Sequence, residues 1–441
     1  MRPHLILTLF AMLLAGPLLR GQGALLDAYV LEAIEQSPYL KEQNLILEKS
    51  QVALAEAKGF YLPEVNLGGT YSLAAGGRSI SIPIGDLLNP VYSTLNQLTQ
   101  TNNFPQVENA EEQFLPNNFY DLRLRTTMPL YNPDVRLQQK ARAEQVNLEE
   151  STLALRKRDL VRDVQTAYFQ YLLASEAINI YDNALALLQE SHRLNEGLVR
   201  NGMAIPSSLL RIQGEISSVE ARKFQAESQQ TLAQANFNNL LGRPYDAAVD
   251  ADPAFEALPG VSATRGQREE LDQLETAARL NALAIEREEK WRYPRVGLQL
   301  DLGSQDFNFA WDGYAILGLS VNVPLWDGAR HSKRLQQAEL GALAVEAQRE
   351  WAVRQIDLQV IQATQSLQSA IAIGNSYDSQ LQSAERFYGE TLKRFRENQA
   401  NYIELLDART QWTNLELEAS IARYQAWIYW AQFQRATANN L

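Results

Sequence analysis

The sequence predicts a membrane α/β protein that is internally duplicated, with four short amphipathic strands and two long coiled-coil hairpins. Three observations lead to this fold class. The same motifs occur twice, in the same order, in the two halves of the chain. Each half contains two short stretches in which apolar and polar residues alternate. Two runs, residues 134–200 and 329–398, contain no proline and carry apolar residues in steps of three and four, a spacing typical of helices.

The first 23 residues are expected to be a secretory signal peptide and not part of the fold. Arg2 lies in a short polar start, residues 5–19 form an apolar run, and the small residues Gly21 and Gly23 precede the expected cleavage site. This layout is typical of an exported protein, and the run is too short for a spanning helix with a stop-transfer sequence. The mature chain is then expected to begin at Ala24.

The composition excludes several classes of site. The chain has no cysteine, and its three histidines, His4, His192 and His331, lie far apart in sequence. Disulfides and thiolate metal sites are therefore excluded, and neither a metal nor another cofactor is expected, although paired carboxylates can hold a hard cation weakly. The formal net charge of −12 argues against nucleic acid as a partner, because phosphates require a basic surface. After residue 23 no window approaches the ~18 to 20 apolar residues of a membrane-spanning helix.

Two copies of one structural plan occupy the mature chain. The matching segments are residues 62–67 with 293–298, residues 128–133 with 323–328, and residues 209–211 with 405–407. Such self-similarity at constant spacing indicates duplicated structure. We predict a first repeat over residues 24–241, a connector over 242–266 and a second repeat over 267–441. Each repeat is expected to contain a helix (residues 25–58 or 268–291), two strands, a long helix and a return helix.

The alternating stretches predict strands near residues 62–73, 119–129, 293–303 and 314–324. Their length is that of a tilted strand crossing a bilayer, and aromatic residues flank them as in the girdles of membrane barrels. A soluble half-buried sheet gives the same alternation, but the flanking aromatics favour the membrane. The apolar face, with Leu122, Leu298 and Leu319, is expected to contact outer-membrane lipid. The polar face is expected to line a lumen with Arg123, Arg125, Arg295, Gln299 and Asp301.

The proline-free runs predict two antiparallel coiled-coil hairpins. Apolar residues recur in heptad steps from Leu160 to Leu188 and from Val353 to Tyr388, which indicates a left-handed supercoil. A polar break ends each long helix, and return helices are expected over residues 207–241 and 402–435. The segments that join the strands, residues 74–118 and 303–312, are expected to be outward-facing loops.

Four strands cannot close a membrane barrel by themselves. An open sheet edge in lipid leaves N–H and C=O groups unpaired, so several copies must assemble around the sheet. A dimer gives eight strands and a trimer twelve, and this argument does not choose between them.

At this point the sequence resembles the TolC-like outer-membrane efflux proteins. The resemblance is carried in order by Ser-Pro-Tyr-Leu at 37–40, Leu-Pro-Glu-Val at 62–65, Met-Pro-Leu-Tyr at 128–131, Val-Pro-Leu-Trp at 323–326 and Tyr-Ile-Glu-Leu-Leu-Asp-Ala at 402–408. It implies a homotrimer whose twelve-stranded outer-membrane β-barrel continues into a long α-helical coiled-coil periplasmic tunnel. It also implies a passive exit duct of a tripartite efflux or secretion system in a Gram-negative-type bacterium. The implied partners are a periplasmic adaptor and an inner-membrane transporter.

The resemblance further implies a narrow periplasmic mouth ringed by acidic residues. Glu404 and Asp407 match those positions, although acids also favour an ordinary solvated helix start. The first repeat carries Ser207 and Ser208 where the family often has an acid. The base that the family has just before the second return helix falls at Ala400 or a neighbour, so the resemblance does not extend to the usual latch between these two sites. We expect Arg211, which aligns with Asp407, to pair with Asp407 or Glu404; the alternative places it on the outer face without a partner.

Three other functions compete with the duct. A periplasmic adaptor is also exported and hairpin-bearing, but adaptors usually have one hairpin between glycine-rich β-domains. A helical structural or surface protein needs no bilayer-length strands. An enzyme is disfavoured because the sequence has no Ser/His/Asp set, phosphate-binding glycine loop or metal-ligand cluster. The transported substrate, the pump class and the resting state of the channel do not follow from the sequence.

Overall fold

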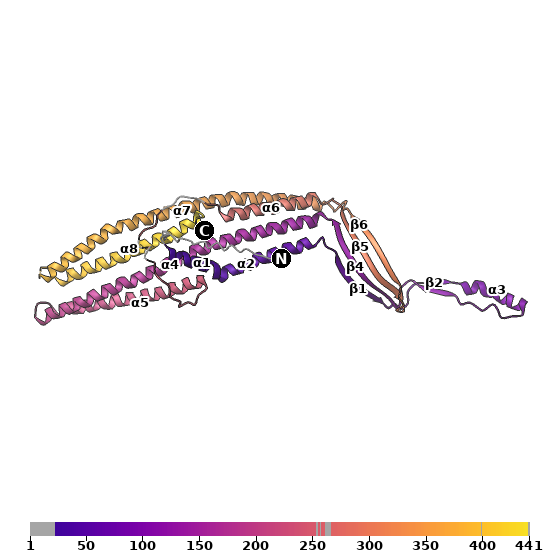
Figure 1. The fold of residues 1–441 in the computed structure, drawn as a ribbon, viewed down its shortest axis with the longest axis horizontal. Helices are drawn as coiled ribbons and strands as arrows, with labels where there is room; N and C mark the ends of the chain where they lie inside the picture. The colour runs from indigo at the N-terminus through magenta and orange to yellow at the C-terminus, as the bar shows by residue number, and fades with distance from the viewer. Residues whose placement is uncertain (1–22, 253–254, 256, 261–265, 398, 440–441) are drawn as a thin grey trace, which may run out of the picture. The chain divides into compact units, whose positions relative to one another are not determined.

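A computed structural model describes residues 23–252, 255, 257–260, 266–397 and 399–439 (Figure 1). The expected signal peptide, up to residue 22, lies outside these described residues. The chain divides into two units. The first takes its residues from 1–50, 144–279 and 342–441, and the second consists of residues 51–143 and 280–341. Four helices have residues in both units: α2 (Pro38–Gly59), α4 (Pro133–Arg200), α6 (Glu269–Glu289) and α7 (Arg330–Arg396).

The second unit contains a four-stranded sheet. Its strands are β1 (Glu64–Ser72), β4 (Phe119–Tyr131), β5 (Arg295–Phe307) and β6 (Gly313–Asn322), in the order β1-β4-β5-β6. Every neighbouring pair is antiparallel, and Figure 1 shows the four strands side by side. Strands from both halves of the sequence therefore form one sheet, with β1 and β6 at its edges.

The register of the sheet separates the apolar and polar residues onto opposite faces. Leu298 lies opposite Leu319, and Arg125 lies opposite Asp301. Because side chains alternate along each strand, the leucines gather on one face and the charged residues on the other. The leucine face is not buried within the chain: Leu317 is 71% and Leu319 is 65% exposed.

The segment between β1 and β4 differs from the expected loop. Within residues 73–118, here named the arm, lie β2 (Ser79–Ile82), helix α3 (Ile84–Thr99) and β3 (Ala110–Gln113), and β2 pairs with β3. The prediction of a plain loop is therefore wrong. The polar residues that suggested a loop are structural, because Asn89 exchanges two hydrogen bonds with the backbone of Val107. Asn96 does the same with Phe104.

The first helix is divided into α1 (Ala24–Gln36) and α2 (Pro38–Gly59), whereas one helix was expected over residues 25–58. The break lies at Ser37, whose backbone is extended, with φ −62° and ψ 124°. Proline disfavours the helical conformation in the residue before it, so Pro38 accounts for the division. The corresponding helix of the second half, α6 (Glu269–Glu289), is continuous.

The two long hairpins are formed as predicted by α4 (Pro133–Arg200) with α5 (Ser207–Leu241), and by α7 (Arg330–Arg396) with α8 (Tyr402–Ala436). The heptad residues provide much of the contact surface. In α4 Leu160, Val164 and Ala167 are buried, and in α7 Ile356 and Leu367 are buried. The sequence pattern therefore identified the packed faces. No helix among the described residues has both the length and the apolarity to cross a membrane.

The core of the first unit is rich in aromatic side chains. Tyr29, Tyr168, Phe169, Phe237 and Trp427 pack together and join α1, α4, α5 and α8. Burial raises the pKa of the Tyr168 hydroxyl, which donates a hydrogen bond to a carbonyl oxygen of the connector. This packing fixes the two hairpins against one another within the first unit.

Candidate aperture at the tips of the helical hairpins

The tips of the two hairpins pack against each other in the first unit. Ala184 and Leu188 of α4, Ile212 of α5 and Leu406 of α8 share one buried cluster with Tyr402. Burial raises the pKa of the Tyr402 hydroxyl above its ordinary value. The starts of α5 and α8 are thus held close together, and so are the residues expected at the aperture.

A capping interaction positions Glu404 at the start of α8. The Asn401 side chain accepts a hydrogen bond from the Glu404 backbone N–H at 2.9 Å, and its Nδ2 donates to Glu404 Oε1 at 2.9 Å. The first bond is an N-cap, and the second joins the two side chains, so it differs from the capping box, in which the glutamate binds the N-cap backbone N–H. Glu404 also lies 3.8 Å from the Arg394 guanidinium. The helix cap therefore orients the carboxylate and leaves it beside a cation.

Arg211 contacts Asp407 and not Glu404. The guanidinium Nη2 lies 3.7 Å from Asp407 Oδ1, and the two side chains are 56% and 67% exposed. The expected pairing is therefore present, and it links α5 of the first hairpin to α8 of the second. Within one chain, both acidic residues face a cation: Glu404 faces Arg394, and Asp407 faces Arg211.

Ser207 and Ser208 lie at the first turn of α5. Ser208 Oγ lies 3.1 Å from Asn195 Oδ1 and 2.7 Å from the carbonyl oxygen of Ile205, so this hydroxyl ties the start of α5 to α4. Ser207, Ser208 and Arg211 line a cavity of about 700 Å³ between the tips, together with Asn195 and Tyr402. Asn195 is fully buried.

Sequence reasoning missed Arg394, because it considered a basic residue only at position 400 or its neighbours. Arg394 lies six positions earlier, in the last turn of α7. The loop after α7 turns back on the helix, because the Gln399 N–H donates to the Arg394 carbonyl oxygen at 2.7 Å. The only sequence signal was the basic last turn of α7, which also fits the ordinary preference of cations for helix C-termini.

The polar face of the sheet carries the residues expected in the lumen. Arg125 binds Asp301 through two hydrogen bonds of 2.8 and 2.7 Å, and Gln299 donates to the same carboxylate at 2.9 Å. Arg123 lies 3.6 Å from Asp121. Arg295, at the start of β5, is 2.7 Å from Asp134 of α4. All five predicted residues are thus on one face, and three of them form one network.

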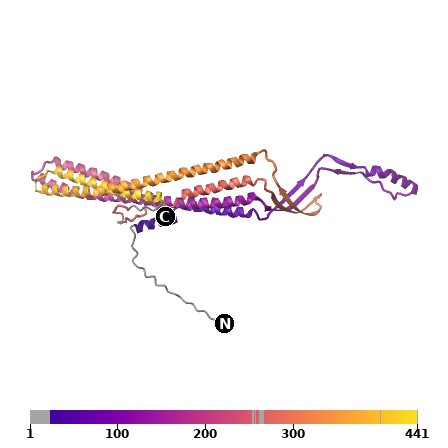
Figure 2. The same cartoon turned by 90° about the horizontal axis from the view of Figure 1, so that it is seen from above.

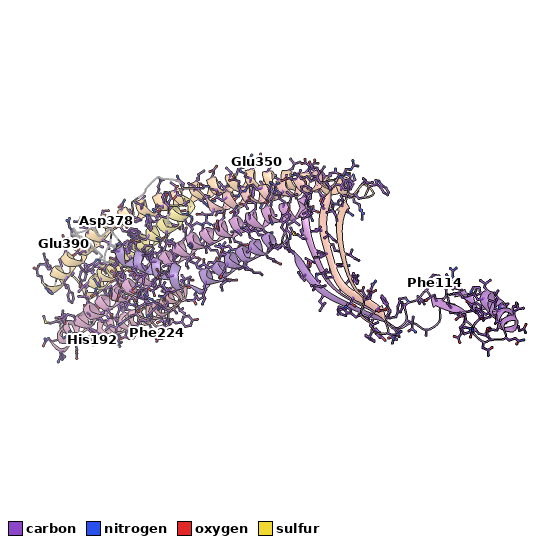
Figure 3. All side chains as sticks on the ribbon, turned by 45° about the vertical axis from the view of Figure 1, so that its right-hand side comes forward. Phe114, His192, Phe224, Glu350, Asp378 and Glu390 are labelled. Atoms are coloured by element: carbon purple, nitrogen blue, oxygen red, sulfur yellow. The ribbon has the colours of Figure 1, made fainter. Side chains whose placement is uncertain are left out.

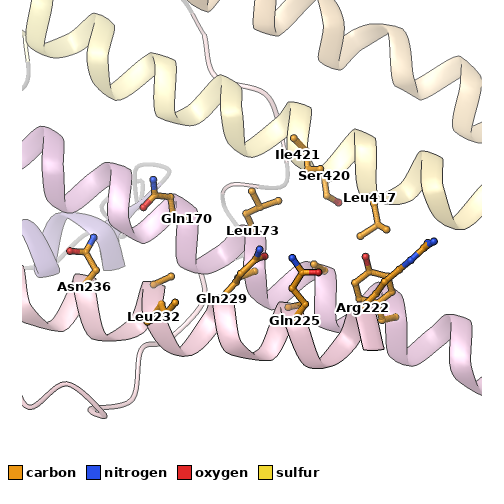
Figure 4. A pocket seen from close by; sticks show the side chains of 15 residues that line it. Gln170, Leu173, Arg222, Gln225, Gln229, Leu232, Asn236, Leu417, Ser420 and Ile421 are labelled. Atoms are coloured by element: carbon orange, nitrogen blue, oxygen red, sulfur yellow. The ribbon is translucent and has the colours of Figure 1, made fainter. Parts of the chain in front are cut away.

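A groove on the first unit runs between α4, α5 and α8. It has a volume of about 580 Å³, and Figure 4 shows Leu173, Gln229, Leu232 and Ile421 around it. Leu232 is 68% exposed. Apolar side chains that stay exposed along a groove are typical of a surface that another chain covers. Among the described residues, no group of three or more His, Asp or Glu side chains is arranged to hold a metal.

Comparison with known proteins identifies the class of fold. The outer membrane channel MtrE of Neisseria gonorrhoeae, solved in an open state, superimposes with a TM-score of 0.74 over 94% of this chain and 89% of that chain, at 16% identity. The fold is therefore the mainly helical, sheet-bearing fold of TolC-like outer-membrane channels, in agreement with the motifs in the sequence.

Sequence comparisons find one matching family model and related secretion proteins. Residues 30–243 match the family model for outer membrane efflux proteins. The proteases secretion protein PrtF of Dickeya chrysanthemi is 22% identical over 62% of this chain, and the match spans just under two thirds, 63%, of that protein. The alkaline protease secretion protein AprF of Pseudomonas aeruginosa is 22% identical over 71% of this chain and 69% of its own length. The chain is thus similar to outer membrane efflux proteins over just under half of its length, and its fold is that of outer-membrane channels.

Proposed function

We propose that this outer-membrane protein is a passive exit duct of a tripartite efflux or type I secretion system. The observation that carries the proposal is the four-stranded sheet, which has an exposed leucine face, a charged opposite face and two unpaired edge strands. Such a sheet suits a bilayer only when further copies complete it. The matched relatives are named as secretion proteins for proteases, which favours polypeptide cargo for this chain.

The assembly proposed is a homotrimer. Three copies give twelve strands, enough to enclose a water-filled lumen, whereas eight-stranded barrels are filled by side chains. In the trimer the leucine face contacts outer-membrane lipid, and Arg123, Arg125, Arg295, Gln299 and Asp301 line the lumen. The helical hairpins continue as a coiled-coil periplasmic tunnel, and the exposed groove between α4, α5 and α8 is covered by a neighbouring copy.

The aperture of the tunnel lies at the hairpin tips in this proposal. Threefold symmetry gathers Glu404 and Asp407 from each copy around the axis, with Ser207 and Ser208 beside them. Arg211 and Arg394 hold these carboxylates in the resting state. A periplasmic adaptor and an inner-membrane transporter supply the substrate and the energy. The adaptor function is not favoured for this chain itself, because the matched family model is that of outer membrane efflux proteins and the structural neighbours are outer-membrane channels.

Reconstitution tests the proposal. The protein is extracted in mild detergent, its mass is measured by native mass spectrometry, and it is inserted into planar bilayers. We expect a trimer that conducts ions in discrete steps. A monomer or dimer as the main species, or a trimer that leaves the bilayer resistance unchanged, contradicts the proposal.

A further inference from the structure

The arm between β1 and β4 has a helix with two contrasting faces. One face of α3 packs on the returning segment of the arm, residues 104–109, through Asn89, Tyr92 and Asn96. The contact is close: a Cβ added at Gly85 would lie 2.3 Å from the carbonyl oxygen of Val107. This face is therefore fully used within the chain.

The opposite face of α3 is apolar and has no covering segment in the described part of the chain. Its six apolar residues fall within an arc of about 100° of the helix surface. Three are more than half exposed, Leu87 at 70%, Val91 at 53% and Leu98 at 77%, and Ile84 and Leu88 are exposed at 36% and 37%. The full set is Ile84, Leu87, Leu88, Val91, Leu95 and Leu98. An apolar helix face of this size on a water-exposed arm is expected to be an interaction surface.

The spacing of these residues indicates which kind of partner fits. Ile84, Leu88, Val91, Leu95 and Leu98 follow one another in steps of four, three, four and three, the repeat of a coiled-coil seam. Asp86 is the only charged residue of α3, so copies of the helix can meet without like-charge repulsion.

A lipid surface fits this helix less well. Helices that lie on membranes usually carry Lys and Arg on their polar face, and α3 carries none. Within the whole arm Arg78 is the only basic residue, against four acidic residues. The arm is also continuous with β1, an edge strand of the sheet, and it is at this edge that the proposed assembly brings copies together. Figures 1 and 2 show the arm leaving the end of the sheet at which β1 ends.

We propose that the α3 helices of three copies pack through this apolar seam and form a three-helix cap over the external outlet of the duct. The inference rests on the proposed trimer. Three equivalent helices can all touch one another only at the threefold axis, and the barrel closes around that same axis. The cap therefore lies across the exit path and must separate when cargo leaves. Phe114, an exposed aromatic residue of the arm labelled in Figure 3, lies outside the seam and is not part of the cap.

The absence of cysteine from the chain allows a direct test. Val91→Cys places one thiol in the seam, and Leu98→Cys repeats the test one heptad further on. Gln97→Cys, at an exposed polar position of the same helix outside the seam, is the matched control. The trimeric protein is oxidised in detergent and in lipid vesicles and analysed by non-reducing electrophoresis, while native mass spectrometry of the same samples measures the assembly.

A disulfide requires Cα atoms within about 7 Å of each other, so the Val91→Cys trimer should link two of its three chains, with a yield at least about tenfold above that of Gln97→Cys. Reduction of the disulfide should raise the single-channel conductance of Val91→Cys and leave the control unchanged. Leu98→Cys should behave as Val91→Cys does.

Four results overturn the cap. Equal linking of Val91→Cys and Gln97→Cys means random collision of mobile arms. A Val91→Cys trimer that fails to link, with its thiol freely labelled by a membrane-impermeant maleimide, means a water-exposed face. A Val91→Cys trimer that fails to link, with its thiol protected only in vesicles, means that lipid covers the face. The absence of a trimer in native mass spectrometry contradicts the proposed assembly and the cap together. Failure of the cap alone differs from this result because the trimer is still present.

Discussion

Reversing the charge of Arg211 should open the resting aperture. Arg211 and Asp407 join the two hairpins at 3.7 Å, so Arg211→Glu replaces an attraction between α5 and α8 with a repulsion. No other described acidic side chain forms an ion pair with Arg211, and the core contacts of Ile212 and Leu406 are left in place. The change therefore acts on the link between the tips and not on the fold of either hairpin.

The size of the effect follows from the exposure of the pair. Both side chains are more than half exposed, and an exposed ion pair contributes about 0.2 to 1 kcal/mol. Three copies in a trimer give about 0.6 to 3 kcal/mol, which shifts the open-to-closed ratio by about 3-fold to 150-fold. Salt should weaken the difference between wild type and variant, because the Debye length falls from about 10 Å at 0.1 M to about 3 Å at 1 M.

Single-channel recording in planar bilayers at low salt measures this ratio. Arg211→Glu should raise the open fraction, and the exchange Arg211→Glu with Asp407→Arg should return it toward the wild-type value. Arg193→Glu is the matched control, because Arg193 makes a similarly exposed ion pair with Glu190 within α4 and joins no second helix. The reasoning is refuted if the two reversals have the same effect, or if the exchange fails to restore closure.

Three further outcomes are expected from the sheet and from the buried charges. Leu319→Arg on the leucine face should destabilise the assembled protein by about 2 to 4 kcal/mol, whereas Gln299→Arg should mainly change conductance. Thermal unfolding in detergent compares the two variants. Equal losses of stability would mean that the two faces of the sheet are misassigned. Arg158→Leu should lower the free energy of unfolding by about 3 to 5 kcal/mol, because it leaves the Glu269 carboxylate buried without its bidentate partner. The double variant Arg158→Leu with Glu269→Leu should recover most of that stability in the same assay. The pKa of the Glu270 carboxyl is lowered from 4.5 to about 2. Burial alone would raise this pKa, but hydrogen bonds from Arg268 and the nearby positive charges outweigh the effect of burial. The ionised carboxylate therefore contributes about 1 to 2 kcal/mol at neutral pH, after allowance for its partial exposure. This contribution is lost as the pH falls from 4.5 through 2, and Glu270→Gln should flatten the stability profile over that range.

Much of the local structure follows from the sequence. Alternation placed the four strands and their two faces, because side-chain direction in a strand depends only on odd or even position. Heptad spacing located the buried stripes of α4 and α7, and the polar breaks located the tips. These patterns depend on geometry within a few residues, so they are visible without knowing what each element packs against.

The arm shows where local patterns mislead. Its Asn-rich composition suggested a loop. Pro90, which lies within α3, also disfavours a helix when only the sequence is considered. The helix forms because Asn89 and Asn96 bond to the backbone of the returning segment, which lies 8 to 18 residues further along the chain. Apolar residues of α3 recur in steps of three and four. They form the seam from which the three-helix cap is inferred.

At the aperture the sequence named the acidic residues and Arg211, but it could not decide which charges meet. The sequence left three possibilities open for Arg211: contact with Asp407, contact with Glu404, or no partner. The lumen and pore roles of these residues, and the trimer itself, stay predictions, because they concern surfaces that only further copies complete.

The sequence by itself therefore determined the four strands, their two faces and the long hairpins, and it carries the motifs of the family resemblance. Only the tertiary structure decided that Arg211 meets Asp407, that Arg394 lies beside Glu404, and that the arm is folded. The physical reason is that a helix or strand period is set by bonds between near neighbours, whereas an ion pair between α5 and α8 depends on how two hairpins slide and rotate against each other. A shift of one helical turn moves a side chain by about 5 Å, which is enough to exchange one partner for another without changing the sequence pattern at all.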